Sequence, residues 1–327
     1  MKLNEFIIKE LYGEYSFRWK LDEKVNILAG INGSYKSTLL KIIRELCYVN
    51  SLNDNYHLSE ATLSFSDEIF LKYKRFEDSL LKLRNESDKD EMLQEIAANV
   101  KADFRDIDEK GLSDRILKAD IIAIKKSREK FPVNKFKELI RVDYISTFDV
   151  PVITDDKAKK SALDIKLEDL EKEYAYYLSD LAKEISSKVI KDGNIDKADL
   201  DAIYRQRENF LSIINDAFSD TNKVLDTSKS RLEFKLNNGK LLHTRDLSSG
   251  EKQFLIIMLT VLLEKEQEYI LLMDEPEISM HFGWQRNLLL NIQRLNPNSQ
   301  IILVTHSPAL IMDGWEQLVT NMNEIRM

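Results

Sequence analysis

The stretch from residue 27 to residue 40, ILAGINGSYKSTLL, nearly matches a pattern that binds phosphate groups. In G-x-x-x-x-G-K-[ST], backbone amides surround the phosphates, while the lysine and the hydroxyl contact phosphate and magnesium. Gly30, Lys36 and Ser37 fill the first glycine, lysine and hydroxyl positions, and Tyr35 replaces the second glycine. The pattern predicts a nucleotide site and leaves open whether Tyr35 permits, weakens or abolishes binding.

The replacement at position 35 has a physical cost. Glycine there permits a positive φ and close approach to phosphate, and a tyrosine held at positive φ costs on the order of 1–3 kcal/mol. A small shift of the loop would instead point the phenol outward, over the nucleotide or towards a second copy. Gly33 still supplies one flexible point. We expect a working nucleotide site with slow hydrolysis, because the chain keeps every other expected residue: Lys36, Ser37, Ser249, Asp274, Glu275 and His306.

Two adjacent carboxylates end an apolar segment, YILLMDEPE, at residues 269–277. Carboxylates at the C-terminal end of a buried strand would meet a bound ligand. Asp274 suits a magnesium ion, and Glu275 suits the orientation or deprotonation of an attacking water. The alternative is a cluster that caps the next helix.

Two further signals are weaker on their own. Ser249 and Gly250 in LSSGEKQ begin a predicted helix, either as part of an ordinary N-cap with Glu251 in the first turn or as an anion site. His306 ends the apolar run IILVTHSP, where it is either structural or in contact with a phosphate.

The elements around the phosphate-binding pattern suit it. Hydrophobic periodicity predicts strands at 4–11, 15–21 and 24–30, then a helix at 37–49. The loop therefore lies between a strand and a helix, as this chemistry requires.

The middle of the chain has a different pattern, which is mostly charged and helical. A hairpin is predicted at 60–75, a charged and mostly helical segment at 76–140, and a strand-like run at 139–150. Two helices are predicted within 155–220, around a turn at 191–196. They form a helical hairpin, either an interaction arm or an insert packed on the main body.

The last hundred residues alternate strands and helices. A β-hairpin is predicted at 231–247, helices at 249–267 and 280–295, and buried strands at 269–276 and 299–308. Apolar strands separated by helices indicate a parallel sheet covered on both faces.

The composition narrows the function classes. Scarce glycine (9) and proline (5) exclude a loop-rich all-β fold. A net charge of −8 argues against nucleic-acid affinity over the whole surface. Local basic patches stay open at KSREK (126–130) and KAKK (157–160).

The single cysteine, Cys47, lies in an apolar helical pattern and is expected to be a buried small hydrophobe. One cysteine cannot form a disulfide within the chain, which suits a reducing cytosol. There is no secretion signal and no run of about 18 apolar residues. We therefore expect a cytoplasmic protein without a membrane partner.

Together, in chain order, these segments resemble the ATP-binding-cassette (ABC) ATPases. GINGSYKST resembles the Walker A motif, LSSGEKQ the signature, ILLMDEP the Walker B motif, EISMH the D-loop, and VTHSP the loop with the switch histidine. The chain is most similar to the soluble branch: SMC-type ATPases, RecF-like proteins and the ATPase half of OLD nucleases. Stand-alone members of that branch resemble ATPase subunits of bacterial anti-phage defence systems, including retron-associated ones.

The resemblance implies an α/β fold: an ABC-ATPase head with a mixed or parallel sheet flanked by helices, N-terminal antiparallel strands, and a helical insert between Walker A and signature. The implied head has two lobes, 1–75 and 228–327. Residues 76–154 would form a mainly helical subdomain and 155–227 the helical hairpin.

The resemblance also implies a mechanism in which two copies close head-to-tail around two ATP molecules. Ser37 and Asp274 would hold Mg²⁺, Glu275 would position water, and His306 would sense the γ-phosphate. The remaining implied nucleotide contacts are Gly30, Asn32, Gly33, Ser34, Tyr35, Lys36, Thr38 and, from the partner copy, Ser249 and Gly250. Tyr12 and Tyr15 are candidates for adenine stacking or are surface aromatics of a hairpin.

The function expected from the resemblance is an ATP-dependent switch, a homodimer or higher oligomer that controls a separate effector protein, a nuclease or toxin, in anti-phage defence. Since little sequence follows His306, the effector activity is expected to reside in another protein. The alternatives are a DNA-repair ATPase similar to RecF or SMC proteins and a transporter ATPase subunit.

Overall fold

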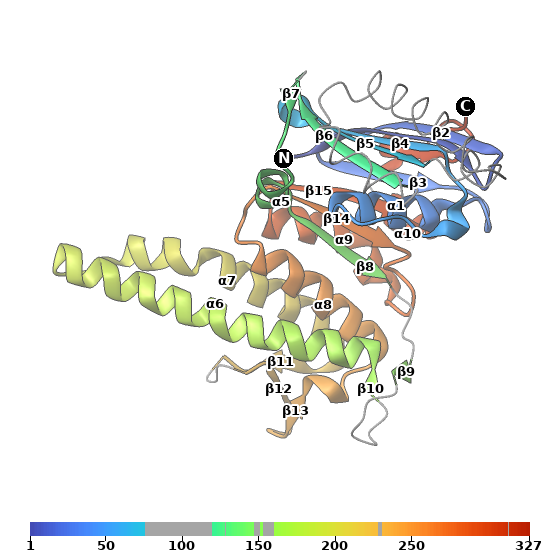
Figure 1. The fold of residues 1–327 in the computed structure, drawn as a ribbon. Coiled ribbons are helices and arrows are strands. Elements are labelled where there is room, and N and C mark those ends of the chain that lie inside the picture. Colours follow the sequence, from blue (N-terminus) through green and yellow to red (C-terminus); the bar gives the residue numbers. More distant parts are fainter. Residues whose placement is uncertain (76–119, 128, 147–150, 153–159, 228–230, 313) are drawn as a thin grey trace, which may run out of the picture. The chain divides into compact units, whose positions relative to one another are not determined.

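The computed structural model describes residues 1–75, 120–127, 129–146, 151–152, 160–227, 231–312 and 314–327 (Figure 1). The chain forms two compact units, which are described separately. The first comprises Met1–Val142, Gln300–Val304 and Thr320–Met327, and the second Asp143–Ser299 and Thr305–Val319.

An antiparallel sheet with strand order β2-β1-β4-β5-β6-β7 dominates the first unit. Its strands are β1 Leu3–Leu11, β2 Tyr15–Lys20, β4 Glu60–Phe65, β5 Ile69–Arg75, β6 Asp120–Lys126 and β7 Glu129–Lys130. Buried residues alternate with partly exposed ones along β4, so the sheet has one core face. The N-terminal strands and the hairpin at 60–75 are confirmed.

Strand β6 corrects the expectation of a mostly helical segment at 76–140. Its sequence, DIIAIKK, pairs along the whole of β5, and Ile124 is buried. β-branched side chains and a free strand edge favour this pairing over a helix. Residues 76–119 lie outside the described part of the chain.

The first unit also contains the strand and the helix that flank the phosphate-binding pattern. Strands β3 (Val25–Ala29) and β15 (Ser299–Val304) pair in parallel, and β16 (Val319–Asn321) neighbours β3. Helix α1 (Lys36–Cys47) buries one apolar face, including Cys47, and this burial raises the pKa of the Cys47 thiol. The expected parallel strand pair and the buried cysteine are confirmed.

The second unit is built around α8 (Ser249–Leu263), which is buried on almost every side. Helices α6 (Ala162–Asp192), α7 (Lys197–Phe218) and α9 (Phe282–Leu295) pack on it. The fully buried strand β14 (Tyr269–Asp274) has β8 as a hydrogen-bonded neighbour. The other short elements of this unit are β8 Val142–Ser146, β9 Pro151–Val152, β10 Lys160–Ser161 and α10 Pro308–Ile311, whereas helix α5 Val133–Leu139 lies in the first unit.

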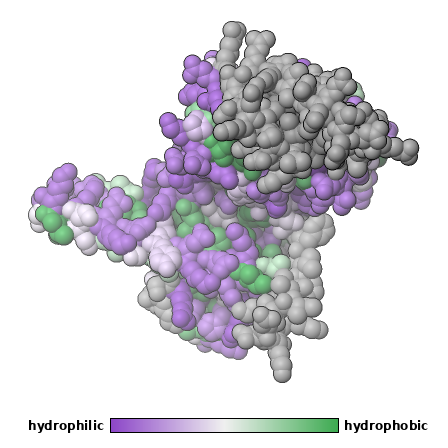
Figure 2. All heavy atoms as spheres, in the orientation of Figure 1, coloured by the Kyte–Doolittle hydropathy of each residue, from purple (hydrophilic) through white to green (hydrophobic). Residues whose placement is uncertain are grey.

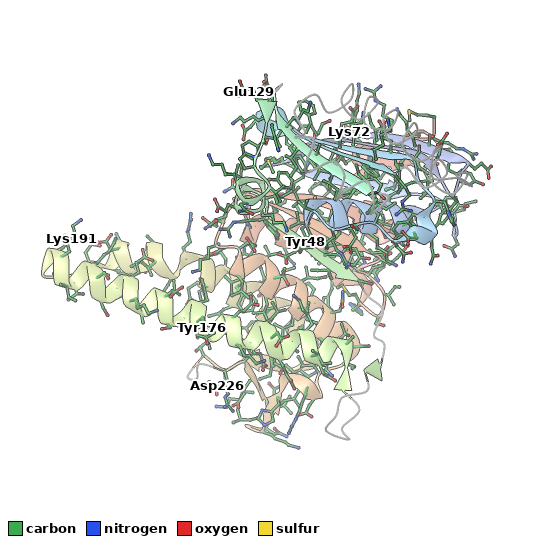
Figure 3. The ribbon with its side chains drawn as sticks, viewed as in Figure 1. Tyr48, Lys72, Glu129, Tyr176, Lys191 and Asp226 are labelled. Atoms are coloured by element: carbon green, nitrogen blue, oxygen red, sulfur yellow. The ribbon has the colours of Figure 1, made fainter. Side chains whose placement is uncertain are left out.

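Helices α6 and α7 form the predicted hairpin, and Figure 1 shows them side by side. The buried residues of α6 end at Leu181, whereas Ile190 is 85% exposed. Figure 3 labels Tyr176 midway along α6 and Lys191 at its far end, and hydrophilic side chains cover most of the hairpin face in Figure 2. One half of the hairpin is therefore packed within the second unit and the other half is exposed; that the exposed half is an interaction arm stays a prediction.

A small antiparallel sheet completes the second unit: β11 (Lys223–Leu225), β12 (Glu233–Leu236) and β13 (Leu241–His243). Its hairpin was expected, but the short β11 was not. The 3₁₀ turns are Asp54–Tyr56, Ser66–Glu68, Ser219–Thr221, Thr244–Asp246 and Glu316–Leu318.

The helical hairpin belongs to the second compact unit. Helix α8 and strand β14 group with the helical hairpin because α6 and α7 bury their apolar faces on α8. Within the described ranges, no helix is both long enough and apolar enough to cross a membrane.

Candidate functional site

The phosphate-binding pattern forms a loop between β3 and α1 in the first unit, as expected. Lys36 is 5% exposed, and its Nζ donates hydrogen bonds to the carbonyls of Gly30 and Ile31, both at 3.0 Å. The ammonium group thus bridges the two ends of its own loop. Asn32 and Gly33 are exposed beside it, and Gly33 has a φ of +78°.

Tyr35 keeps the backbone conformation of the glycine that it replaces. Its φ is +69° and its ψ is 12°, at the N-cap of α1. Tyr35 therefore adopts left-handed backbone angles, and its ring packs on other aromatic rings.

Those rings belong to Tyr12 and Tyr15. The Tyr35 ring centroid lies 5.2 Å from that of Tyr12 and 4.8 Å from that of Tyr15, and the Arg326 guanidinium lies 4.6 Å from the Tyr15 ring centroid. A hydrogen bond with Tyr35 and the nearby carboxylate of Glu14 raise the pKa of Tyr15. The three tyrosines and Arg326, here termed the tyrosine cluster, form an aromatic surface beside the loop.

The second unit holds the carboxylate pair at the end of β14. Asp274 is fully buried, and the Tyr144 hydroxyl donates a hydrogen bond to its Oδ2 at 3.2 Å. Glu275 has a φ of +51°. Its Oε2 accepts from the His306 backbone N–H at 3.2 Å, and its Oε1 lies 3.3 Å from His306 Nε2. The structure thus brings Glu275 and His306 together.

The signature segment begins α8 with the N-cap that the sequence suggested. Ser248 and Glu251 form a reciprocal capping box. Burial alone would raise the pKa of Glu251, but hydrogen bonds from Lys223 and Ser248 outweigh it and hold that pKa below its ordinary value. Ser249 is exposed at the start of the helix.

Gly250 packs against the segment that follows the carboxylates. A Cβ at Gly250 would lie 2.1 Å from the Ser279 carbonyl oxygen, which no side chain allows. Ser279 itself has a φ of +70°. Glycine is therefore required here because the helix start and the D-loop-like segment approach within backbone contact.

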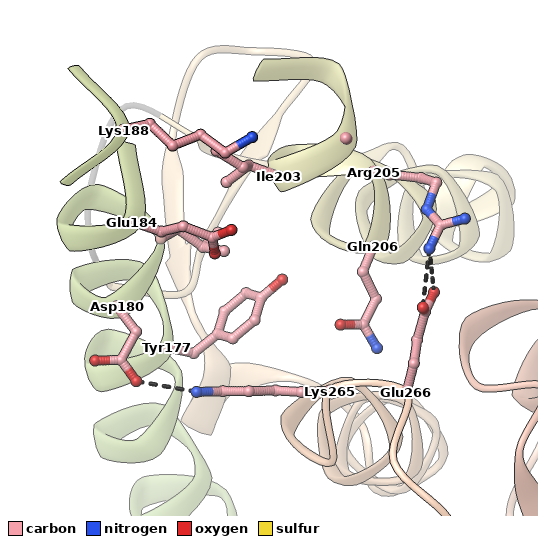
Figure 4. Close-up of a pocket in the computed structure, with 11 residues that line it drawn as sticks. Tyr177, Asp180, Glu184, Lys188, Ile203, Arg205, Gln206, Lys265 and Glu266 are labelled. Atoms are coloured by element: carbon pink, nitrogen blue, oxygen red, sulfur yellow. Dashed lines mark hydrogen bonds and ion pairs between the residues drawn. The ribbon is translucent and has the colours of Figure 1, made fainter. Parts of the chain in front are cut away.

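A separate cavity of about 350 Å³ lies between α6, α7 and the residues after α8. Ion pairs join Asp180 to Lys265 at 2.9 Å and Arg205 to Glu266 at 2.8 Å at its edges (Figure 4). Its lining contains none of the motif residues, and exposed pairs of this kind contribute little stability. The ion pairs link the hairpin to the end of α8.

Tyr144, Glu277 and Arg326 were not among the residues predicted from the sequence. Glu277 is the third carboxylate in DEPE, so its type and its place after the strand are visible in the sequence. Tyr144 and Arg326 reach Asp274 and Tyr15 only through the fold, so no local pattern could identify them.

The residues fit a nucleotide with magnesium. Within the described parts of the chain, no group of three or more His, Cys, Asp or Glu side chains could hold a metal ion. A single buried carboxylate and a serine hydroxyl suit Mg²⁺, which usually shares its ligands with phosphate and water.

The fold is similar to that of solved SMC heads. The SMC head domain from Thermotoga maritima has a TM-score of 0.50 and 10% identity, covering 98% of this chain and 94% of that chain. A Smc head domain with an extended coiled coil, bound to the C-terminal domain of ScpA derived from Pyrococcus furiosus, has a TM-score of 0.51 and 12% identity, covering 95% and 91%. At these identities the similarity shows the fold alone.

A curated relative is the retron Vc95 probable ATPase of Vibrio cholerae serotype O1 biovar El Tor. It is 26% identical over 139 residues, or 39% of this chain and 27% of that protein. The match thus spans about a quarter of the relative's length.

Residues 25–313 match one family model over most of the chain. The chain therefore belongs to the family described as AAA domain, putative AbiEii toxin, Type IV TA system, and its fold is similar to that of SMC head domains.

Proposed function

We propose that this chain is a cytoplasmic ATPase that binds ATP with magnesium, closes into a head-to-tail homodimer and controls a separate effector in anti-phage defence. The observation that supports hydrolysis most directly is the contact between Glu275 and His306 beside buried Asp274. A carboxylate at this position can orient and deprotonate a water, and the imidazole can contact the phosphate that the water attacks.

The loop supplies the phosphate contacts in this proposal. The Lys36 ammonium bonds two loop carbonyls, and a bound nucleotide would add phosphate oxygens to its partners. Backbone amides from Asn32 to Thr38 would bind the same phosphates. Mg²⁺, held by Ser37 and Asp274, would neutralise charge on the phosphates.

The tyrosine cluster is the proposed base platform. Tyr12 is 40% exposed, and the Arg326 guanidinium reinforces the cluster from the Tyr15 side. An adenine could stack on these rings. Because the rings already pack on one another, little further conformational freedom of the tyrosine side chains would be lost on binding.

Two observations support the switch. Ser249 is exposed at the start of a long helix. There, the γ-phosphate of an ATP bound to a second copy could accept hydrogen bonds from the Ser249 hydroxyl and from the backbone amides of the helix terminus. A relative named as the retron Vc95 probable ATPase supports an ATPase role next to a retron. The projecting half of α6 and α7 is the proposed contact surface for the effector.

Hydrolysis is tested with three proteins. The wild type should release phosphate from ATP. Lys36→Ala should lose nucleotide binding in titration calorimetry, whereas Glu275→Gln should keep binding and lose at least about tenfold in hydrolysis, as expected when a base is removed. A wild type that neither binds nor hydrolyses ATP would overturn the proposal.

Dimerisation is tested by light scattering on Glu275→Gln across ATP concentrations. The mass should double with ATP and return with ADP. Ser249→Arg should bind ATP but stay monomeric, because the new side chain blocks the helix start. An unchanged mass in Glu275→Gln would contradict the ATP-driven dimer.

DNA handling is the second candidate. Lys72, Lys74 and Lys125 lie on one face of the paired strands β5 and β6, because Lys125 is opposite Phe70 and residues alternate between faces. ATP-dependent DNA binding that weakens by orders of magnitude between about 50 and 200 mM salt would favour this function. DNA binding without salt or ATP dependence would not.

A further inference from the structure

Glu277 is a buried carboxylate outside the Asp274–Glu275 pair. It is 7% exposed and lies in the segment that follows β14. A carboxylate in such a position is costly unless hydrogen bonds stabilise it. The hydrogen-bond donors to the Glu277 carboxylate therefore identify the segment that it stabilises.

Within the described residues, the donors to the Glu277 side chain come from one loop, residues 305–307, and all of them bond its Oε1. Its Oε1 accepts from the Thr305 hydroxyl and from the backbone N–H groups of His306 and Ser307, each N–H at 3.2 Å. Consecutive N–H groups aimed at one oxygen form an anion-binding turn. Here the anion is a side chain of the same chain.

The same loop carries the proposed phosphate sensor. The His306 N–H is shared between Glu277 and Glu275, at 3.2 Å each, while the imidazole Nε2 lies 3.3 Å from Glu275 Oε1. Glu277 therefore fixes the backbone from which the imidazole reaches Glu275.

A second anchor fixes the far end of the loop. The Ser307 hydroxyl donates to Gln285 Oε1 at 2.6 Å, and Gln285 Nε2 donates to the Met280 carbonyl at 2.9 Å. Glu277 and Gln285 thus tie the loop to the segment after β14 and to α9. Glu277 also bonds the His306 backbone.

We propose that Glu277 is a positioning residue for ATP hydrolysis: it holds loop 305–307 so that the His306 imidazole stays against Glu275. This inference rests on the proposed function. Glu277 has no proposed contact with nucleotide; it acts through His306.

Glu277→Ala should lower kcat by about tenfold to a hundredfold, the effect expected when a reacting group is misplaced by an ångström or so. The KM for ATP should change less than about threefold, because the binding of ATP in the ground state depends on contacts made by the Lys36 loop. Glu277→Gln keeps an acceptor oxygen but loses the charge, so its kcat should fall between those of wild type and Glu277→Ala. An unchanged kcat in Glu277→Ala overturns the inference.

The matched control is Glu233→Ala. Glu233 is also 7% exposed, and its carboxylate lies 3.5 Å from His243 in the small sheet, away from the motif residues. It reports the general effect of removing a buried carboxylate from this unit. An equal loss of kcat in both variants would show that Glu277 is merely structural.

A double-mutant cycle gives a readout that a structural role would not produce. In the His306→Ala background, Glu277→Ala should cause little further loss of kcat, because the two residues act as one unit. If the fold-loss of kcat in the double variant equals the product of the losses in the two single variants, the inference is overturned.

Amide hydrogen exchange separates this inference from the proposed function. In Glu277→Ala, the amides of residues 305–307 should exchange faster than in wild type, and in Glu233→Ala they should not. If the wild type fails to hydrolyse ATP, the proposed function falls, and the exchange still decides whether Glu277 holds the loop. Unchanged exchange in Glu277→Ala would show that it does not.

Discussion

Tyr35 combines a strained backbone with favourable ring contacts. Left-handed angles cost a non-glycine residue about 1–2 kcal/mol, and each aromatic pair contributes about 0.5–1.5 kcal/mol beyond its buried area. Two pairs, with Tyr12 and Tyr15, are of the size needed to offset the strain. The tyrosine can therefore stand in the glycine position without distortion of the loop.

We predict that Tyr35→Gly keeps ATP binding and raises hydrolysis by a few-fold, because glycine adopts the same angles freely and allows closer phosphate approach. Tyr35→Phe, which keeps both the rings and the strain, is the matched control and should resemble wild type. Titration calorimetry and phosphate release measure the two effects.

The opposite result has a clear meaning. If wild type fails to bind ATP and Tyr35→Gly restores binding, the tyrosine disables the loop and the active-ATPase proposal is wrong.

At the scale of elements, the start of α8 is fitted to the segment after β14. Gly250 leaves no room for a Cβ against the Ser279 carbonyl, and Glu277 in the same segment holds the His306 loop. A displacement at the helix start would therefore be transmitted to the carboxylate and imidazole groups through directly bonded neighbours.

We predict that Gly250→Ala destabilises the fold by about 1–3 kcal/mol, as overpacking does, and lowers hydrolysis while ATP binding by the Lys36 loop is kept. The matched control is Gly283→Ala in α9, where a Cβ meets its nearest atom at an ordinary 3.5 Å. Denaturant unfolding and phosphate release test both variants. Equal free energies of unfolding for the two variants would mean that the backbone around Ser279 moves at little cost to accommodate the new Cβ.

At the scale of the whole molecule, buried charge sets the pH dependence of stability. Burial, helped by Glu264, raises the pKa of Asp143 to about 6 from 3.8, while Lys166 opposes this shift. An acid whose pKa is raised by folding binds its proton more tightly in the native state. Its contribution to stability is therefore largest below about pH 4 and is lost as the pH rises through 6.

We predict that Asp143→Asn increases the free energy of unfolding at pH 7 by roughly 1–3 kcal/mol and leaves it unchanged near pH 4. Urea unfolding at the two pH values tests this. Asp169→Asn is a control, since Asp169 is exposed and its pKa is lowered by the hydrogen bond from Lys172; it should not stabilise the protein at pH 7. A gain for Asp143→Asn that is equal at both pH values would contradict the linkage.

Much of the fold and of the candidate site was accessible from the sequence by itself. The loop at 30–37 between strand and helix, the apolar strand that ends at Asp274, and the capped helix at Ser249 all depend on residue types at short spacing. Such spacing decides which backbone angles are allowed and which side chains face the core. These are local properties, so the chain order of the motifs was enough to predict the family.

Only the tertiary structure decided which distant residues meet. The Tyr35 ring packs on Tyr12 and Tyr15, Glu277 bonds residues 305–307, and β6 pairs with β5 where a helix was expected. Periodicity specifies that a side chain is buried, but it does not specify its partner, because many partners satisfy the same burial. The partner is chosen by the packing of the whole core and by the requirement that each buried polar group find a hydrogen bond.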